Sequence, residues 1–401
     1  MIKTAKKIKG DKVIWVVVVL LSIFSLLAVY SSTGTLAYRK QGGNTEYYLF
    51  KHFIILLFGF GLMYVTHLIN YKYFSRLSQI GLILTIPLLI FTLRSGATLN
   101  EASRWIVVPY INLTFQSSDM AKLFLIMYLA RVLSKKQEQI NDFKSGFLPV
   151  ILPVFIICAL IIPANFSTAA ILFVTCLVLM FIGRISMKFM FSVVGIGLIA
   201  LLLIFTLGKT FPVAFPRAGT WTNRIDHFIH QDKTAEDANH PYLDQVEQAK
   251  IAVASGGIFG KSPGKSTQRN FLPHPYSDFI FAIIIEEYGI VGASFVLLLY
   301  LVLFFRVVRI AAKFQGNFGA FLATGLGFSL AFQAMINMAV AVHLFPVTGQ
   351  TLPLISMGGT SIWFTSIAIG IILSVSRRIE IETKDGTEID ILSEQPVTAT
   401  A

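Results

Sequence analysis

Ten separate apolar runs divide this sequence, and they constrain its fold more than any other feature. They fall at about 13–32, 52–69, 77–93, 119–134, 147–163, 168–183, 189–207, 278–305, 317–342 and 359–376. A helix of about 20 apolar residues is long enough to cross a bilayer. Only 13% of the residues are charged, against about 25% in soluble domains. We therefore predict an all-α polytopic membrane protein with ten transmembrane helices, which excludes a soluble enzyme.

The polar segments divide the chain into three parts. A short basic tail, 1–12, precedes a ten-span domain over 13–376, and a polar tail, 377–401, follows it. The long polar segment 208–277 is predicted to form a large loop between helices 7 and 8. The first apolar run is longer than the core of a signal peptide, so we interpret it as an uncleaved span. The acidic, Thr-rich tail from Ile379 is expected to be disordered.

The basic residues predict the orientation of the chain in the membrane. There are 33 Lys and Arg against 21 Asp and Glu, a net charge of +12. With a cytoplasmic N-terminus, more than half of the 33 fall in cytoplasmic segments, as the positive-inside rule requires. Both termini are then cytoplasmic and the 208–277 loop is extracytoplasmic. Because the basic residues are scattered and match no nucleic-acid motif, we expect no nucleic-acid partner.

Four carboxylates lie inside or at the edges of apolar runs, namely Asp119, Asp278, Glu286 and Glu287. A charge at membrane depth costs about 2.5–3.5 kcal/mol on insertion scales, so each should face a partner or a water-filled cavity. Asp278 opens the eighth run at the predicted outer interface. It suits either a helix-terminus acid or a general base at the mouth of a cavity. Helical periodicity places Glu286 nearer this cavity and Glu287 on another side, in a structural ion pair.

Basic residues near these acids are candidates for binding an anion. Lys122 shares a helix face with Asp119 at spacing i, i+3, which suits either a capped helix start or a functional pair. Arg104 and Trp105 suit an outer interfacial site. A cationic long loop would suit a pyrophosphate-bearing lipid, although a merely solvated loop explains the same residues. Its basic residues are Lys209, Arg217, Arg224, Lys233, Lys250, Lys261, Lys265 and Arg269.

No metal site is predicted from the sequence. His227, His230 and His240 are close together, but no Cys or carboxylate spacing supports them as ligands. Cys158 and Cys176 lie inside apolar runs, where they act as small hydrophobic residues.

Several motifs along the chain resemble those of the SEDS family of membrane glycosyltransferases (shape, elongation, division and sporulation). The matching stretches are Ser103–Ile106, Gln116–Lys122, Gln248–Gly260, Gln268, Phe271–Pro273, Asp278–Ala282, Glu286–Gly289, Asn337–Met338 and Pro346–Ser361. There are two departures from the family pattern. Asp119 stands where the family usually has Glu, and Asn165 stands for Asp in the turn 163–168.

The resemblance implies an inverting peptidoglycan glycosyltransferase that polymerises lipid II into β-1,4 glycan strands at the outer face of the cytoplasmic membrane. It implies Asp278 as the essential residue. Lys122, Asp119 and Glu286 would support catalysis, by orienting the base or contacting phosphate. The candidates for contacting the substrate pyrophosphate are Arg104, Trp105, Arg217, Arg224, Lys265, Gln268 and Arg269.

The resemblance also implies partners and leaves alternatives open. The partners would be lipid II, a cognate class B penicillin-binding protein, other divisome membrane proteins and membrane lipids. Residues 10–15 and 99–105 favour the division type over the elongation type, and hence the septum. No cofactor is established, although a divalent cation, Mg²⁺ or Mn²⁺, could bridge Asp278 and the pyrophosphate. The rival functions are a lipid II flippase and a non-catalytic divisome scaffold.

Overall fold

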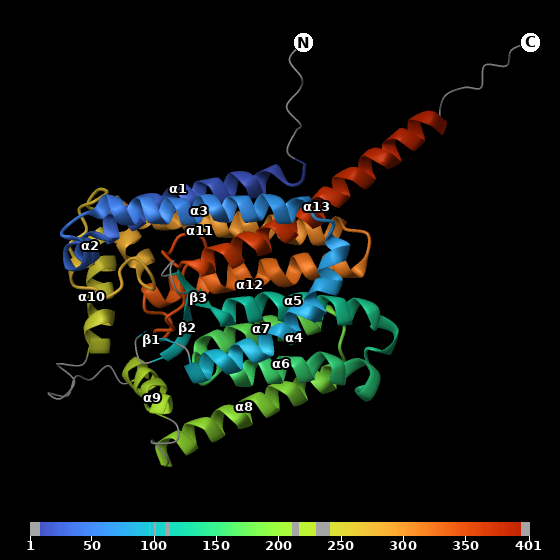
Figure 1. The fold of residues 1–401 in the computed structure, drawn as a ribbon, viewed down its shortest axis with the longest axis horizontal. Coiled ribbons are helices and arrows are strands. Elements are labelled where there is room, and N and C mark those ends of the chain that lie inside the picture. Colours follow the sequence, from blue (N-terminus) through green and yellow to red (C-terminus); the bar gives the residue numbers. More distant parts are fainter. Residues whose placement is uncertain are drawn as a thin grey trace, which may run out of the picture.

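The computed structural model is mainly helical and describes residues 9–95, 97–99, 102–108, 113–210, 216–229 and 241–393 (Figure 1). A helix lies at each of the ten apolar runs. The helices are α1 (Lys12–Ser32), α2 (Gly34–Gln41), α3 (Thr45–Leu68), α4 (Tyr71–Ser95), α5 (Ser117–Lys135), α6 (Leu148–Ile161), α7 (Phe166–Ile182), α8 (Met187–Thr210), α9 (Pro216–Ile229), α10 (Pro241–Gly256), α11 (Ile280–Lys313), α12 (Asn317–Ala341) and α13 (Thr360–Ser393).

Within the described residues, seven helices are long and apolar enough to cross a membrane. These are α1, α3, α4, the continuous helical stretch Phe143–Ile161 that ends in α6, α11, α12 and α13. Two further apolar helices are shorter, α7 and the Met187–Leu203 part of α8. Helix α5 carries charged residues at both ends, including Asp119, Lys122 and Arg131, and it is not among these spans. The chain is a multi-pass membrane protein.

A small sheet is present where the sequence analysis expected only helices and loops. Strands β1 (Ala97–Leu99), β2 (Ala102–Val108) and β3 (Leu113–Gln116) pair antiparallel in the order β1-β2-β3, with Trp105 opposite Gln116. The all-α prediction is therefore wrong for this segment. Its apolar stretches are too short to span a membrane, and β-branched residues such as Ile106 favour strands. The Thr360 hydroxyl joins the sheet to α13 through Gln116 N (3.2 Å) and Thr114 O (3.1 Å).

The helices share two ends, which we call the terminal end and the loop end. At the terminal end Gly10 N donates to Glu380 (2.8 Å) and Asp11 binds Arg306, so the start of α1 lies beside α13. The loop end carries α2, α10 and the sheet (Figure 1). Helix α13 continues to Ser393, so the prediction of disorder from Ile379 is wrong for residues 379–393. Just before this continuation, Arg377 donates to Leu68 O (3.0 Å) and ties α13 to α3.

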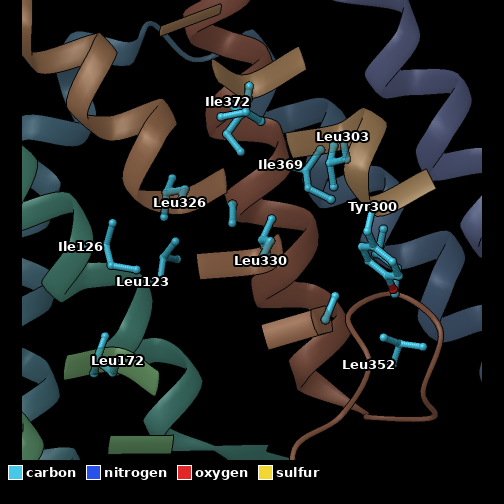
Figure 2. Close-up of a cluster of buried hydrophobic side chains, with 14 of the residues drawn as sticks. Leu123, Ile126, Leu172, Tyr300, Leu303, Leu326, Leu330, Leu352, Ile369 and Ile372 are labelled. Carbon is cyan, nitrogen blue, oxygen red and sulfur yellow. The ribbon is translucent and has the colours of Figure 1, made fainter. Parts of the chain in front are cut away.

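The core of the bundle is formed by side chains of several helices. Figure 2 shows residues of α5, α7, α11, α12 and α13 converging, with Tyr300 pointing toward the chain segment that carries Leu352. Apolar side chains gain little by leaving lipid for protein, so close packing has to hold such helices together. Gly325 of α12 provides one close approach, since a Cβ there would lie 2.8 Å from Ile126 of α5 and 3.0 Å from Leu179 of α7.

Helix α11 is broken at Gly289, whose φ of 66° lies in the left-handed region. The segment that follows α10 fills this break. Lys261 N and Ser262 N donate to the carbonyls of Glu286 and Glu287, and Ile290 N and Val291 N donate to those of Gly257 and Ile258, at 2.9 to 3.2 Å. A Cβ at residue 289 would lie 2.2 Å from Ile258 O, so this position requires glycine. The first part of α11, preceded by Asp278, is thus held by the long loop.

Candidate active site

Asp278 lies at the loop end, two residues before α11, and its main chain is held at three consecutive carbonyls. Met357 N donates to Tyr276 O (2.9 Å), and Ser356 Oγ donates to Ser277 O (2.7 Å). Asn337 Nδ2 donates to the carbonyl of Asp278 itself (2.9 Å). These donors belong to α12 and to the α12–α13 segment, which we define as residues 342–359. The backbone of Asp278 is therefore fixed by parts of the chain that lie 59 to 81 residues further on.

The carboxylate of Asp278 is half-buried and accepts a hydrogen bond from Ser277 Oγ (2.8 Å). Tyr276 lies close to it. Burial raises the pKa of the Tyr276 phenol, and the charges of Tyr48 and Asp278 raise that pKa further. The phenol therefore stays protonated at neutral pH, within 3.2 Å of His274 Nδ1. The site thus combines a carboxylate with a neutral hydroxyl donor.

Two amide side chains of α12 connect Asp278 to the predicted Asp119–Lys122 pair. Lys122 Nζ lies 3.3 Å from Asp119 Oδ1 and donates to Gln333 Oε1 (2.7 Å). Gln333 Nε2 donates to Thr351 O (2.9 Å). One turn further along α12, Asn337 donates to Gln350 O (2.7 Å) as well as to Asp278 O. The side chain of Lys122 is only 14% exposed, so it does not extend out into the membrane interface.

The sequence analysis missed Gln333, Asn337 and Ser356 as site residues. Asn337 and Ser356 belong to motifs that carried the family resemblance, but no role was inferred for either. A signal was present in α12, because two amides at spacing i, i+4 place a polar stripe on one face of an apolar helix. In membranes such side chains commonly bond across helices.

The α12–α13 segment is itself fixed by hydrogen bonds from side chains of α1 and α11. Ser25 Oγ donates to Ile355 O (2.7 Å), and Tyr300 donates its phenolic hydrogen to Pro353 O. Leu354 between them is buried and has a φ of 66°, a conformation that costs a non-glycine residue about 1–2 kcal/mol. Strain of this kind persists only where the surroundings over-determine the backbone. The segment that positions Asp278 is thus rigidly built.

Glu286 and Glu287 serve the long loop rather than the Asp278 carboxylate. Glu286 is fully buried and forms an ion pair with Lys261 (2.7 Å), and it also accepts bonds from Ser266, Thr267 and Gln268 N. Glu287 accepts bonds from Ser31 Oγ and Ser266 N. We expected the ion pair at Glu287 and a cavity-facing Glu286, but the ion pair forms at Glu286, and both side chains are buried. The prediction assumed an unbroken helix and could not include the loop that fills the Gly289 break.

The predicted anion-binding residues do not form one group. Gln268 N donates to Glu286, and Arg269 Nη1 donates to Ser31 O (3.0 Å), so both residues belong to the group of side chains around Glu286 and Ser31. Lys265 is exposed nearby. Arg224 of α9 is half-buried and donates to Val347 O (3.1 Å), which places it on the α12–α13 segment. Trp105 lies in β2. The side chains of Arg104, Arg217, His227, His230 and His240 lie outside the described residues.

A metal centre finds no support in the described part of the chain. It contains no group of three or more His, Cys, Asp or Glu side chains that could hold an ion.

A sequence model of the FtsW/RodA/SpoVE family of cell cycle proteins matches residues 11–381. The chain belongs to this family. Among curated relatives, the probable peptidoglycan glycosyltransferase FtsW of Geobacter sp. strain M18 is 32% identical over 384 residues, covering 93% of this chain and 99% of the relative. Stage V sporulation protein E of Bacillus subtilis is 33% identical over 381 residues, covering 93% and 99%.

Solved structures of the FtsW/RodA/SpoVE fold also match. The rod shape determining protein RodA of Thermus thermophilus aligns with a TM-score of 0.66 at 22% identity, covering 93% of this chain and 98% of RodA. A chain from a structure titled for the coordination of polymerization and crosslinking by a peptidoglycan synthase complex aligns with a TM-score of 0.69 at 22% identity, covering 92% and 98%. These structures show that the chain shares the RodA fold.

Proposed function

We propose that this FtsW/RodA/SpoVE family member is a peptidoglycan glycosyltransferase that polymerises lipid II into β-1,4 glycan strands. The names of its full-length relatives support the reaction class. One structural observation carries the assignment of the site. Asp278 is a half-buried carboxylate whose main chain is held at three consecutive carbonyls, as expected for a catalytic group that must keep its position.

The reaction requires a base and a stabilised leaving group. The acceptor hydroxyl oxygen of lipid II forms a bond to the anomeric carbon of the α-linked donor, and the bond from that carbon to the pyrophosphate oxygen breaks. The centre inverts once, which gives the β linkage. Asp278 takes the hydroxyl proton, and the pyrophosphate leaves with the electron pair. General base catalysis of this kind contributes about 10²–10⁴-fold.

Lys122 is the cation that we assign to the departing pyrophosphate. Its ammonium group is held by Asp119 and Gln333, and Gln333 and Asn337 place it in a fixed relation to the Asp278 backbone. Asp119 is thus a positioning residue for Lys122. A preorganised cation stabilises charge as it develops on a leaving oxygen.

An apolar cavity of about 230 Å³ suits part of the polyprenyl chain of lipid II. It is lined by aromatic and aliphatic side chains of α7, α9, α12 and the α12–α13 segment, with Arg224 among them. An apolar cavity that ends beside a guanidinium matches a lipid chain attached to a phosphate. Of the remaining pyrophosphate candidates, Gln268 and Arg269 bond to Glu286 and Ser31 and hold the loop, whereas Lys265 is exposed.

The proposed membrane arrangement has ten spans with both termini in the cytoplasm, so that the loop end faces outward. The tails 1–12 and 377–401 are then cytoplasmic and flank the 13–376 domain. The Gly10–Glu380 contact supports termini on one side. Both native cysteines are buried, so introduced cysteines can be labelled selectively. An impermeant maleimide should label Ser262→Cys in intact cells and Lys144→Cys only after permeabilisation. The opposite pattern would reverse the orientation.

We further propose that the enzyme acts with a crosslinking partner, a class B penicillin-binding protein, and with other divisome membrane proteins at the septum. The similarity to a chain of a peptidoglycan synthase complex supports a crosslinking partner. The FtsW names of relatives support a division role over an elongation role.

The deciding experiment is lipid II polymerisation by the full chain in liposomes, alone and with the partner. Asp278→Asn should reduce the rate at least 100-fold while leaving expression and melting temperature unchanged. Asp142→Asn is the matched control, because Asp142 is exposed and its carboxylate accepts local hydrogen bonds, including one from Ser145 N. Polymer formation by Asp278→Asn at the wild-type rate would refute the assignment of the base. Lipid II transfer across liposomes without polymer would favour the flippase.

A further inference from the structure

A small cavity adjoins the Asp119–Lys122 pair between α5, α12 and α13. Its volume is about 20 Å³. Most of its wall is apolar, but four oxygen-bearing side chains line it, namely Asp119, Ser329, Ser361 and Thr365. A cavity holds one water if its volume by this measure is at least about 10–15 Å³ and two to four polar partners are present. This cavity is too small for a sugar or a phosphate.

The polar groups around this cavity lack hydrogen-bond partners among the described residues. Asp119 is 4% exposed, and Lys122 binds its Oδ1, while its buried Oδ2 has no partner there. The hydroxyls of Ser329, Ser361 and Thr365 likewise form no hydrogen bond with any described residue. A buried carboxylate oxygen left without a donor costs about 1–3 kcal/mol or more. One buried carboxylate oxygen without a donor, beside three hydroxyls that line the same cavity, indicates an occupant.

The charge of the neighbourhood selects the kind of occupant. The Lys122 ammonium already balances the Asp119 carboxylate. A sodium ion on Oδ2 would place a second cation beside the ammonium that is already paired with this carboxylate, and the two cations would repel each other. A water molecule adds no charge. It can donate to the carboxylate oxygen and exchange hydrogen bonds with hydroxyls, which donate and accept equally well.

We propose that this cavity binds one water molecule, which donates to Asp119 Oδ2 and bridges it to the hydroxyls of Ser329, Ser361 and Thr365. The bound water joins α13 to the pair and keeps Asp119 oriented, so that Lys122 stays fixed for the pyrophosphate. The first turn of α13 is itself positioned by the bonds of Thr360 to the sheet. The kinetic consequence rests on the proposed function, whereas the water site does not.

The direct test is a structure of the full-length protein in nanodiscs at a resolution that shows ordered water. Density for one water within hydrogen-bond distance of Asp119 Oδ2 is expected. In Thr365→Val, which keeps the side-chain shape and removes one hydroxyl, this density should weaken or vanish. An empty cavity in the wild-type protein would overturn the proposal, and so would unchanged density in the variant together with unchanged stability.

Melting and kinetics supply a second measurement. The control is Thr175→Val, because the buried Thr175 hydroxyl bonds only Ile171 O of its own helix (2.8 Å). Thr365→Val should lower the melting temperature by about 2 °C more than the control. It should also lower kcat for lipid II polymerisation about 3- to 10-fold with KM within twofold, as expected when a group that stabilises the departing pyrophosphate is loosened. Equal behaviour of the two variants would contradict the bridging water.

A sodium titration distinguishes a bound water molecule from a bound sodium ion in the cavity. At constant ionic strength, replacing choline by sodium should leave the melting temperature unchanged. A saturable rise with sodium, absent in Asp119→Asn, would mean a cation site and would overturn the proposal. If the wild-type protein makes no polymer in any condition, the proposed function fails, while the density and melting results still decide the water site.

Discussion

Asp278 and the Glu286–Glu287 pair lie within ten residues of one another but are held in opposite ways. Asp278 is fixed through its main chain, by bonds to three successive carbonyls, and its carboxylate remains half-buried at the loop end. Glu286 is fixed through its fully buried carboxylate. This group forms an ion pair with Lys261 and accepts hydrogen bonds from three consecutive loop residues.

The difference distinguishes two uses of an acid near a membrane surface. A carboxylate whose oxygens are saturated with donors is stabilised as an anion and has little capacity to take a proton. Such a group holds structure. A carboxylate whose backbone is held and whose side chain is only half-buried can take part in proton transfer. The contrast therefore favours Asp278 over Glu286 as the group that takes the proton in the proposed reaction, and it assigns Glu286 to the folding of the long loop.

The strongest challenge to this contrast is Glu286→Gln. Glu286 is fully buried but Lys261 is 32% exposed, so losing the ion pair and the bonds to the loop costs at most about 3–5 kcal/mol, and we expect a clear loss of melting temperature and of folded yield. The polymerisation rate per folded molecule should fall far less than in Asp278→Asn. A variant that folds normally but has lost all activity would instead make Glu286 part of the catalytic site.

Gly289→Ala tests whether the break in α11 is required. A Cβ at the φ of 66° and ψ of -167° of this residue, a combination that essentially only glycine adopts, costs about 1–3 kcal/mol in backbone strain, and overpacking against Ile258 O adds about 1–3 kcal/mol. We expect destabilisation in thermal melting and exposure of the loop to proteolysis near Lys261. Gly257→Ala is the comparison for strain alone, because it also has positive φ but no atom lies near its Cβ. Equal effects would mean that the loop does not dock tightly.

Asn337→Leu tests whether activity requires the hydrogen bond that holds the backbone of Asp278. Losing the bonds to Asp278 O and Gln350 O should lower kcat about 10- to 100-fold, because small misplacements of a reacting group are costly. KM should change less than threefold, and Asn337→Gln should recover part of the rate. A loss confined to KM, or to stability, would remove Asn337 from the positioning role.

The smallest effect that we expect is on the pH dependence of stability, through His343. Burial and the charge of Lys250 lower the pKa of His343. The unfolded state therefore binds a proton first as pH falls, and stability declines from about pH 6.5 toward the folded pKa. The contribution is a few tenths of a kcal/mol, about the size of other partly exposed charge effects. His343→Asn, which tolerates the φ of 60°, should flatten the fall in melting temperature between pH 7 and 5.5. An unchanged slope would contradict this.

The sequence predicted the helices well because apolar length decides which segments enter a membrane. It predicted their ends less well. Helix α3 begins at Thr45, seven residues before its apolar run, because Asn44 caps it through Tyr47 N (3.1 Å) and polar residues continue the helix. The sheet around Trp105 was missed because hydropathy carries no information on strand pairing.

The site was predicted where charges interrupt apolar runs. Asp278, Asp119 and Lys122 are conspicuous for that reason. Neutral amides and hydroxyls such as Asn337 and Ser356 are common in membrane proteins, and only the fold shows that their partners are the carbonyls around Asp278. The roles of Glu286 and Glu287 depended on loop residues whose approach no helical periodicity encodes.

The break at Gly289 makes one helix depend on a distant stretch of chain for its own backbone bonding. Four main-chain bonds join residues 257–262 to 286–291 in a fixed register. Adding or deleting a single residue between Gly257 and Ser262 would misalign several of these bonds at once. A length change in what looks like a surface loop would therefore behave as if it had been made inside a membrane helix. Epitope tags and reporter insertions should avoid this stretch.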